Sequence, residues 1–114
     1  MVATRLEVRM PLEGVRGVVL DLDGTVYDDQ GLIPGAAEAV TALRSAGLGL
    51  RFATNTSRFP RGALVERLRS LGVHATRDEV ITAPRAAAAW LVSHGLTRIS
   101  LHVAATTVEE VAAF

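Results

Sequence analysis

Cysteine and lysine are both missing from this sequence of 114 residues, so all 12 of its basic residues are arginine. The absence of cysteine excludes disulfides, thiolate nucleophiles and cysteine-based zinc sites, and it fits the cytoplasmic location that we expect. The 12 basic residues are balanced by 12 acidic ones, which leaves no net charge. A protein that binds nucleic acid or an anionic membrane carries a basic excess, so we expect neither partner.

Long apolar runs are missing as well, and none in this sequence approaches the roughly 18 residues that span a bilayer. Residues 1–10 alternate charged with apolar side chains and lack the apolar segment of a signal peptide. With 49% hydrophobic and 21% charged residues, the composition is typical of one globular domain. We therefore expect an N-terminal tail over residues 1–14 and a folded unit over residues 15–114.

Apolar patterning predicts strands that alternate with helices. A valine-rich run over residues 15–20 predicts a strand that is buried on both faces. Alternating side chains predict two more strands, over residues 48–53 and 99–103. Helices of about 10–15 residues separate these strands, which indicates βαβ units and a parallel sheet. The expected fold class is therefore α/β.

Each of the first three helices is expected to have a proline near its first turn and a glycine just after its last turn. Thr82 is expected to cap the third helix with its side chain, and Trp90 and Leu91 to face the core. Thr107 and Glu110 match the capping box of a fourth helix. The first three helices are expected within Pro34 to Gly47, Pro60 to Gly72 and Thr82 to Gly95.

Two carboxylates, those of Asp21 and Asp23, directly follow the first predicted strand. Gly24 permits the backbone bend that turns both of them toward one pocket. Two crowded like charges favour a bound cation, and Mg²⁺ prefers carboxylate oxygen. One carboxylate can then act as a nucleophile and the other as a general acid and base.

A second polar cluster, of Thr54 to Ser57, follows the next predicted strand. Ligands of parallel α/β sheets bind outside the carboxyl ends of the strands, where both clusters lie. The hydroxyl of Thr54 and the amide of Asn55 can hydrogen-bond the oxygens of a phosphoryl group during its transfer. The sequence therefore predicts a phosphoryl-transfer site at this edge of the sheet.

Residues 18–25 (VVLDLDGT) and 52–57 (FATNTS) resemble the first and second signatures of the haloacid dehalogenase (HAD) superfamily. The resemblance covers residues 16–103, and residues 60–72 resemble the branch with a large cap inserted after the third core strand. It implies a partial Rossmann-like core, a three-layer α/β/α arrangement whose C-terminal half and cap are missing. The first strand, central in the full fold, would here be an exposed edge.

The resemblance also assigns roles. Asp21 is expected to be the nucleophile that forms an aspartyl-phosphate, and Asp23 the acid that protonates the leaving group and later activates water. Both belong to the expected Mg²⁺ site, Asp23 through its backbone carbonyl. The remaining implied positions bind the substrate or shape the turn beside it, and they are Thr54, Asn55, Gly24 and Thr25.

The expected function is therefore Mg²⁺-dependent hydrolysis of a small phosphorylated substrate, performed as part of a longer chain. The apolar stripe of Val108, Val111 and Ala112 ends the sequence without a partner, which also predicts a fragment. The alternative is a truncated, inactive half-domain that binds Mg²⁺ or a partner, because the third-signature lysine or arginine and the second acidic pair have no counterpart here. A nucleotide-binding α/β domain is disfavoured, because no glycine-rich phosphate loop is present.

Overall fold

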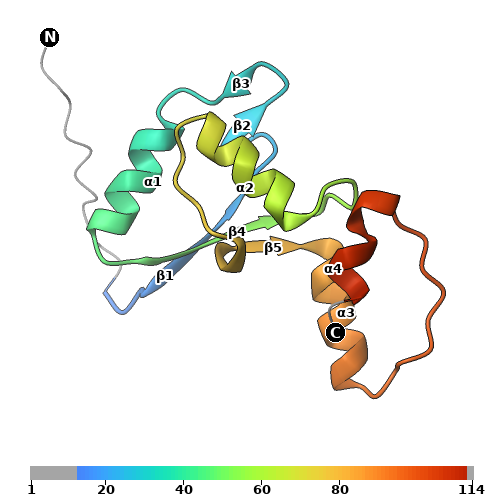
Figure 1. The fold of residues 1–114 in the computed structure, drawn as a ribbon. Helices are drawn as coiled ribbons and strands as arrows, with labels where there is room; N and C mark the ends of the chain where they lie inside the picture. Colours follow the sequence, from blue (N-terminus) through green and yellow to red (C-terminus); the bar gives the residue numbers. More distant parts are fainter. Residues whose placement is uncertain (1–12, 113–114) are drawn as a thin grey trace, which may run out of the picture.

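The structure, a computed structural model, describes residues 13–112. The predicted tail over residues 1–14 lies outside this range except for its last two residues. A parallel three-stranded sheet in the order β1-β4-β5 runs through the molecule (Figure 1), and this confirms the predicted α/β class. Its strands are β1 (Gly17–Asp21), β4 (Gly49–Thr54) and β5 (Val80–Thr82).

The other elements connect and cover these strands (Figure 1). Two of them form an antiparallel hairpin, β2 (Tyr27–Asp28) and β3 (Gly31–Leu32). The helices are α1 (Ala36–Ser45), α2 (Arg61–Ser70), α3 (Ala83–Ser93) and α4 (Val108–Ala112), with 3₁₀ turns η1 (Arg77–Glu79) and η2 (Ala105–Thr107).

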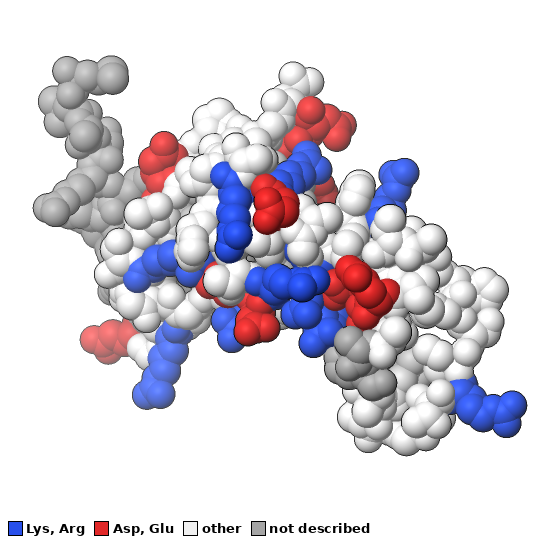
Figure 2. Space-filling view, viewed as in Figure 1, with Lys and Arg blue, Asp and Glu red and all other residues white. Residues whose placement is uncertain are grey.

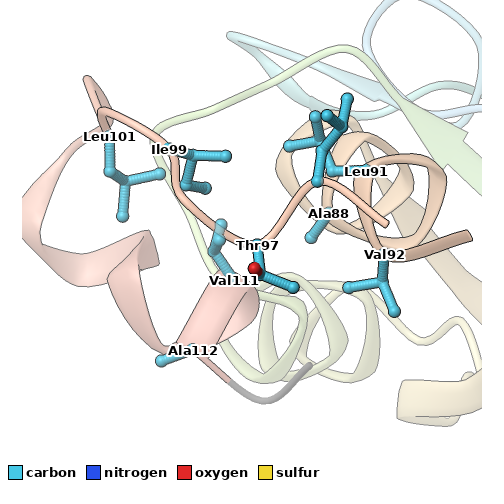
Figure 3. A pocket seen from close by; sticks show the side chains of 9 residues that line it. Ala88, Leu91, Val92, Thr97, Ile99, Leu101, Val111 and Ala112 are labelled. Atoms are coloured by element: carbon cyan, nitrogen blue, oxygen red, sulfur yellow. The ribbon is translucent and has the colours of Figure 1, made fainter. Parts of the chain in front are cut away.

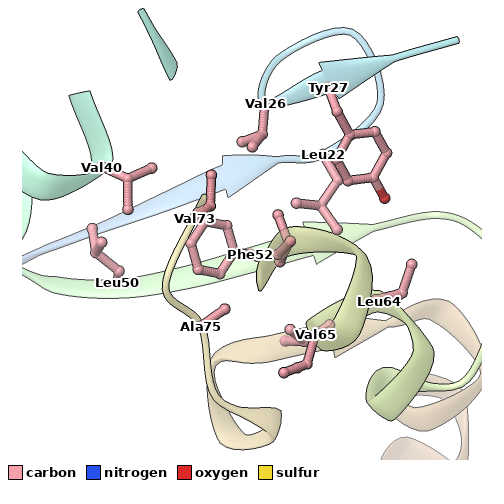
Figure 4. Packing of buried hydrophobic residues seen from close by; sticks show 12 residues of the cluster. Leu22, Val26, Tyr27, Val40, Leu50, Phe52, Leu64, Val65, Val73 and Ala75 are labelled. Atoms are coloured by element: carbon pink, nitrogen blue, oxygen red, sulfur yellow. The ribbon is translucent and has the colours of Figure 1, made fainter. Parts of the chain in front are cut away.

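The hydrophobic core lies between α1, α2 and one face of the sheet (Figure 4). The opposite face is open, because Val19 of β1 is 66% exposed and Ile81 of β5 is 39% exposed. β1 is an edge strand, as expected, but it is not buried on both faces, because no helix within residues 13–112 covers its second face. The core consists of Leu22, Val26, Tyr27, Val40, Leu50, Phe52, Leu64, Val65, Leu68, Val73, Ala75 and Val80.

The third strand lies elsewhere than predicted. Residues 99–103 form no strand, and Ile99 and Leu101 are 44% and 40% exposed. The strand that pairs with β4 is β5, where Val80 lies opposite Phe52. β5 has only three residues, too few for an alternating pattern to reveal it in the sequence.

The first three helices lie within their predicted ranges. Gly47 ends α1 with a positive φ of 80°, and the amide of Leu48 donates to the carbonyl of Leu43. Two of the predicted details of α3 differ. Trp90 does not face the core but is 56% exposed and stacks on His94, with ring centroids 4.0 Å apart. Thr82 precedes the helix without forming a side-chain cap.

The predicted capping box of α4 is wrong. The hydroxyl of Thr107 donates to the carbonyl of Ser57 at 3.0 Å, and the carboxylate of Glu110 reaches α2 instead of its own helix. Glu110 is 3% exposed and accepts hydrogen bonds from the backbone N–H and the side-chain Nε of Arg61, at 2.8 and 3.1 Å. A residue far along the chain therefore caps α2 and ties α4 to the segment that follows Thr54.

An ion pair joins α1 to η1. The two guanidinium N–H groups of Arg44 donate to the two carboxylate oxygens of Glu79 at 2.7 and 2.9 Å, and one of them also donates to the carbonyl of His74. The hydrogen bonds from Arg44 are the largest of the effects that lower the pKa of Glu79 below its usual range. Because the folded pKa lies below the unfolded one, the pair stabilises the fold above about pH 4.3. That stabilisation is lost as the pH falls through the lowered pKa.

We expect Glu79→Gln to lower the free energy of unfolding by about 1–2 kcal/mol at pH 7, because a charge-assisted pair becomes a weaker neutral one. The deficit should shrink toward zero as the pH falls below the folded pKa, where wild-type Glu79 is protonated as well. Urea denaturation at pH 7 and at a series of lower pH values measures how the deficit changes. Glu66→Gln is the control, because Glu66 is exposed and its ion pair with Arg69, at 3.9 Å, is too long and too solvated to add much stability. A loss of unfolding free energy that stays equal at every pH would contradict the role of the Glu79 charge.

Candidate functional site

The turn that carries the two acidic residues is anchored by the residue between them. Asp21 ends β1, and both Asp21 and Asp23 are exposed, whereas Leu22 is fully buried in the core. The carbonyl of Leu22 accepts hydrogen bonds from the amides of Thr25 and Val26 at 3.1 and 2.9 Å. Gly24 has a φ of 80°, so it supplies the bend that the sequence predicted.

The hairpin β2–β3 supports this turn from behind. The amide of Gly24 donates to the carbonyl of Tyr27 at 2.8 Å, and Tyr27 lies beside Leu22 at one end of the core (Figure 4). Arg67 of α2 lies 4.0 Å from the centre of the Tyr27 ring and donates to the carbonyl of Asp28 at 3.2 Å. Burial, and after it the charge of Asp23, raises the pKa of Tyr27. The turn is therefore held between the sheet, the hairpin and α2.

Sequence reasoning missed this hairpin and the contact of Tyr27 with Arg67. Each strand of the hairpin has only two residues, too short to show alternation. Its one readable signal is the polar turn of residues 28–31, in which the carboxylate of Asp28 accepts from the amide of Gln30.

The second polar cluster lies at the end of the neighbouring strand. Asp21 is in register with Ala53, so Thr54 lies one residue beyond Asp21 along the sheet. Thr54 is 7% exposed, and its hydroxyl oxygen accepts from the amide of Thr56 at 3.2 Å. The hydrogen of that hydroxyl remains able to donate to a ligand. Asn55 follows and is exposed.

An open depression at the carboxyl ends of the strands brings together Asp21, Thr54 and Asn55. Asp23, Gly24 and Thr25 belong to the adjoining turn and do not line it. The other residues that line the depression are uncharged, and they are Val19, Ala53, Ile81, Thr82, Ala83 and Ala86.

The residues at this turn are suited to Mg²⁺. Within residues 13–112, no group of three or more histidine or acidic side chains is placed to hold a metal ion. Mg²⁺ does not need such a group, because it commonly binds one or two protein carboxylates and completes its shell with water and substrate phosphate. Asp21 supplies one such carboxylate in the depression, and the backbone carbonyl of Asp23 in the adjoining turn is the second protein oxygen that the resemblance implies.

A separate apolar pocket lies between α3, the segment that follows it and α4 (Figure 3). Figure 2 shows charges of both signs interspersed on the visible face, with few of them at the α3–α4 end. None of the helices in residues 13–112 is long and apolar enough to cross a membrane. The pocket is lined by Ala88, Leu91, Val92, Leu96, Thr97, Ile99, Leu101, Val111 and Ala112.

Comparison with known proteins decides the family. The model of a family described as haloacid dehalogenase-like hydrolase matches residues 18–113. The chain belongs to this family. This confirms the resemblance that the two signatures indicated.

Two curated human relatives of this HAD-like chain illustrate the match. Haloacid dehalogenase-like hydrolase domain-containing protein 2 is 40% identical over 73 residues, which is 64% of this chain and 28% of the relative. Phospholysine phosphohistidine inorganic pyrophosphate phosphatase is 44% identical over 81 residues, which is 68% of this chain and 30% of the relative. The HAD-like chain therefore spans less than a third of the length of these relatives.

Solved structures agree on the fold of the HAD-like chain. The p-nitrophenyl phosphatase of Archaeoglobus fulgidus superposes with a TM-score of 0.77 at 28% identity, over 86% of this chain and 38% of the neighbour. A glycerol phosphate phosphatase of Mycobacterium tuberculosis in complex with magnesium gives a TM-score of 0.67 at 26% identity, over 83% and 29% of the two chains. Both neighbours are phosphatases by name.

Proposed function

We propose that the protein is a phosphohydrolase that transfers the phosphoryl group of a small phosphorylated substrate to water through Asp21. The observation that carries the proposal is the depression at the carboxyl ends of β1 and β4, where Asp21, Thr54 and Asn55 come together. Membership of a hydrolase family and similarity to phosphatases support the same reaction class.

The chemistry follows from the groups around the depression. A carboxylate oxygen of Asp21 bonds to phosphorus while the bond from phosphorus to the leaving oxygen breaks, and Asp23 gives that oxygen its proton. Water then attacks phosphorus and passes a proton to Asp23, and the bond to Asp21 breaks to release inorganic phosphate. Asp21 and Asp23 thereby return to their starting states.

Thr54 and Asn55 orient the phosphoryl group in this proposal. The Thr54 hydroxyl has a free hydrogen, and the Asn55 amide is exposed at the mouth of the depression, so both can donate to phosphoryl oxygens. Asp21, together with the backbone carbonyl of Asp23, would hold Mg²⁺. When bound, that ion supplies positive charge that offsets the charge on the phosphoryl oxygens.

Hydrolysis of p-nitrophenyl phosphate by the purified protein tests the proposal. We expect turnover with millimolar Mg²⁺, loss of turnover when EDTA removes the ion, and recovery when excess Mg²⁺ is returned, because two carboxylates alone leave the phosphoryl charge uncompensated. Turnover that is equal with and without EDTA would contradict the assigned role of the metal.

A second candidate function is a catalytically inactive half-domain that binds Mg²⁺. It is favoured by one observation, that no lysine or arginine of residues 13–112 lines the depression. This candidate predicts Mg²⁺ binding by calorimetry without hydrolysis at any protein concentration. The first candidate predicts both, so the two measurements together separate them.

A further inference from the structure

Thr82 has a buried hydroxyl that the fold leaves unused. It ends β5 and lies in register with Thr54, which ends β4. Only 1% of Thr82 is exposed, and its buried hydroxyl oxygen has no hydrogen-bond partner among residues 13–112. Most buried polar groups in native proteins are hydrogen-bonded, so an unpaired one calls for an explanation.

Helix capping does not supply that explanation. Thr82 occupies the N-cap position of α3, where threonine ordinarily accepts a hydrogen bond from the first turn, yet its side chain makes no such bond. The first turn of α3 also contains no acidic residue, so no carboxylate of its own occupies the positive end of this 11-residue helix.

The location of Thr82 suggests a ligand instead. Thr82 lines the same depression as Asp21, Thr54 and Asn55. Because its hydroxyl makes no hydrogen bond within residues 13–112, a ligand oxygen that reaches it displaces no existing partner. A hydroxyl at the start of a helix suits an anion, since the helix dipole favours negative charge there.

We propose that Thr82 is a further phosphoryl-binding residue, whose hydroxyl donates to an oxygen of the substrate's phosphoryl group beside Thr54. This inference rests on the proposed function and adds a third strand to the site, because β1, β4 and β5 then each contribute the side chain at their carboxyl end. The phosphoryl oxygen would be the hydrogen-bond partner that the described residues do not give the Thr82 hydroxyl.

The test measures binding of inorganic phosphate and thermal stability of Thr82→Val and Thr82→Ser. Valine keeps the shape of threonine and lacks the hydroxyl, so we expect calorimetric phosphate affinity, with Mg²⁺ present, to fall about ten- to a hundredfold. Serine restores the hydroxyl and should bring the affinity back to nearly that of the wild type. Without phosphate, the Tm of Thr82→Val should stay unchanged or rise by a few degrees, because the Thr82 hydroxyl makes no hydrogen bond within residues 13–112 that the substitution could remove.

Thr107→Val is the matched control for stability. Thr107 is also fully buried, but its hydroxyl donates to the carbonyls of Ser57 and Ala104, so we expect its Tm to fall. Unchanged phosphate affinity in Thr82→Val, or a Tm loss as large as that of Thr107→Val, overturns the inference. So does a wild-type protein that does not bind phosphate. None of these measurements needs turnover, so they are separate from the hydrolysis assay that tests the proposed function.

Discussion

Asp21→Asn is expected to abolish hydrolysis of p-nitrophenyl phosphate, with a loss of at least about 10⁴-fold in kcat. The amide oxygen of asparagine is a poor nucleophile, so no covalent phosphoryl intermediate can form. The fold should survive, because Asp21 is exposed, and its carboxylate accepts a hydrogen bond only from the adjacent amide of Leu22 in the described part of the chain. Initial rates and the Tm of both proteins give the comparison.

Asp29→Asn is the matched control for this variant. It makes the same change of charge on an exposed residue of the hairpin turn, outside the depression. We expect it to retain close to wild-type turnover, which separates the loss of a nucleophile from the loss of one negative charge. Turnover in Asp21→Asn comparable to that of Asp29→Asn would remove Asp21 from the mechanism.

Asp23→Asn is expected to have an effect that depends on the leaving group. The general acid matters most for a poor leaving group, so hydrolysis of an alkyl phosphate should fall by about 10²- to 10⁴-fold. p-Nitrophenolate leaves without full protonation, so transfer to Asp21 should stay fast while attack by water becomes slow. The variant should therefore release about one p-nitrophenolate per protein in a burst and then turn over slowly.

Rapid-mixing absorbance measures this burst, with the wild-type protein as the reference. If Asp23 acts only through its negative charge and transfers no proton, hydrolysis of both substrates should fall by the same factor, and no burst should occur. The buried anchor Leu22 and the supporting hairpin are unchanged in the variant, so a change in the geometry of the turn is not expected to account for the result.

The parts of the fold that the sequence predicted correctly are those with long local patterns. The helices beginning after Pro34 and Pro60 span ten residues each and are followed by a glycine two residues beyond their last residue, so periodicity and end signals agree. The two polar clusters are adjacent in sequence to their strands, and parallel pairing brings the strand ends together.

The parts that could not be predicted depend on contacts between distant residues. Glu110 lies 49 residues from Arg61, and nothing local shows that its carboxylate caps another helix rather than its own. Residues 99–103 alternate like a strand, yet alternation alone supplies no neighbouring strand to pair with. Trp90 is exposed because the apolar face of a helix is buried only where another element covers it.

The candidate site shows the same division. Asp21, Thr54 and Asn55 could be placed together from the sequence, because each lies at or just beyond the end of a strand. Thr82 was interpreted as a helix cap, since threonine before a proline-containing first turn is typical of one. Only the structure shows that its side chain forms no cap and that the residue is in register with Thr54 on the neighbouring strand. A residue that departs from its usual structural role is a common mark of a functional position.

Detection of a phosphoryl group on Asp21 tests the central claim most directly. Asp23→Asn is mixed with p-nitrophenyl phosphate and Mg²⁺, quenched in acid during the slow phase, digested and examined by mass spectrometry. The account predicts one added phosphoryl group on the peptide that contains Asp21, and none in the Asp21→Asn, Asp23→Asn double variant. An unmodified Asp21 peptide throughout the burst and slow phases, or a phosphoryl group on another residue, would contradict it.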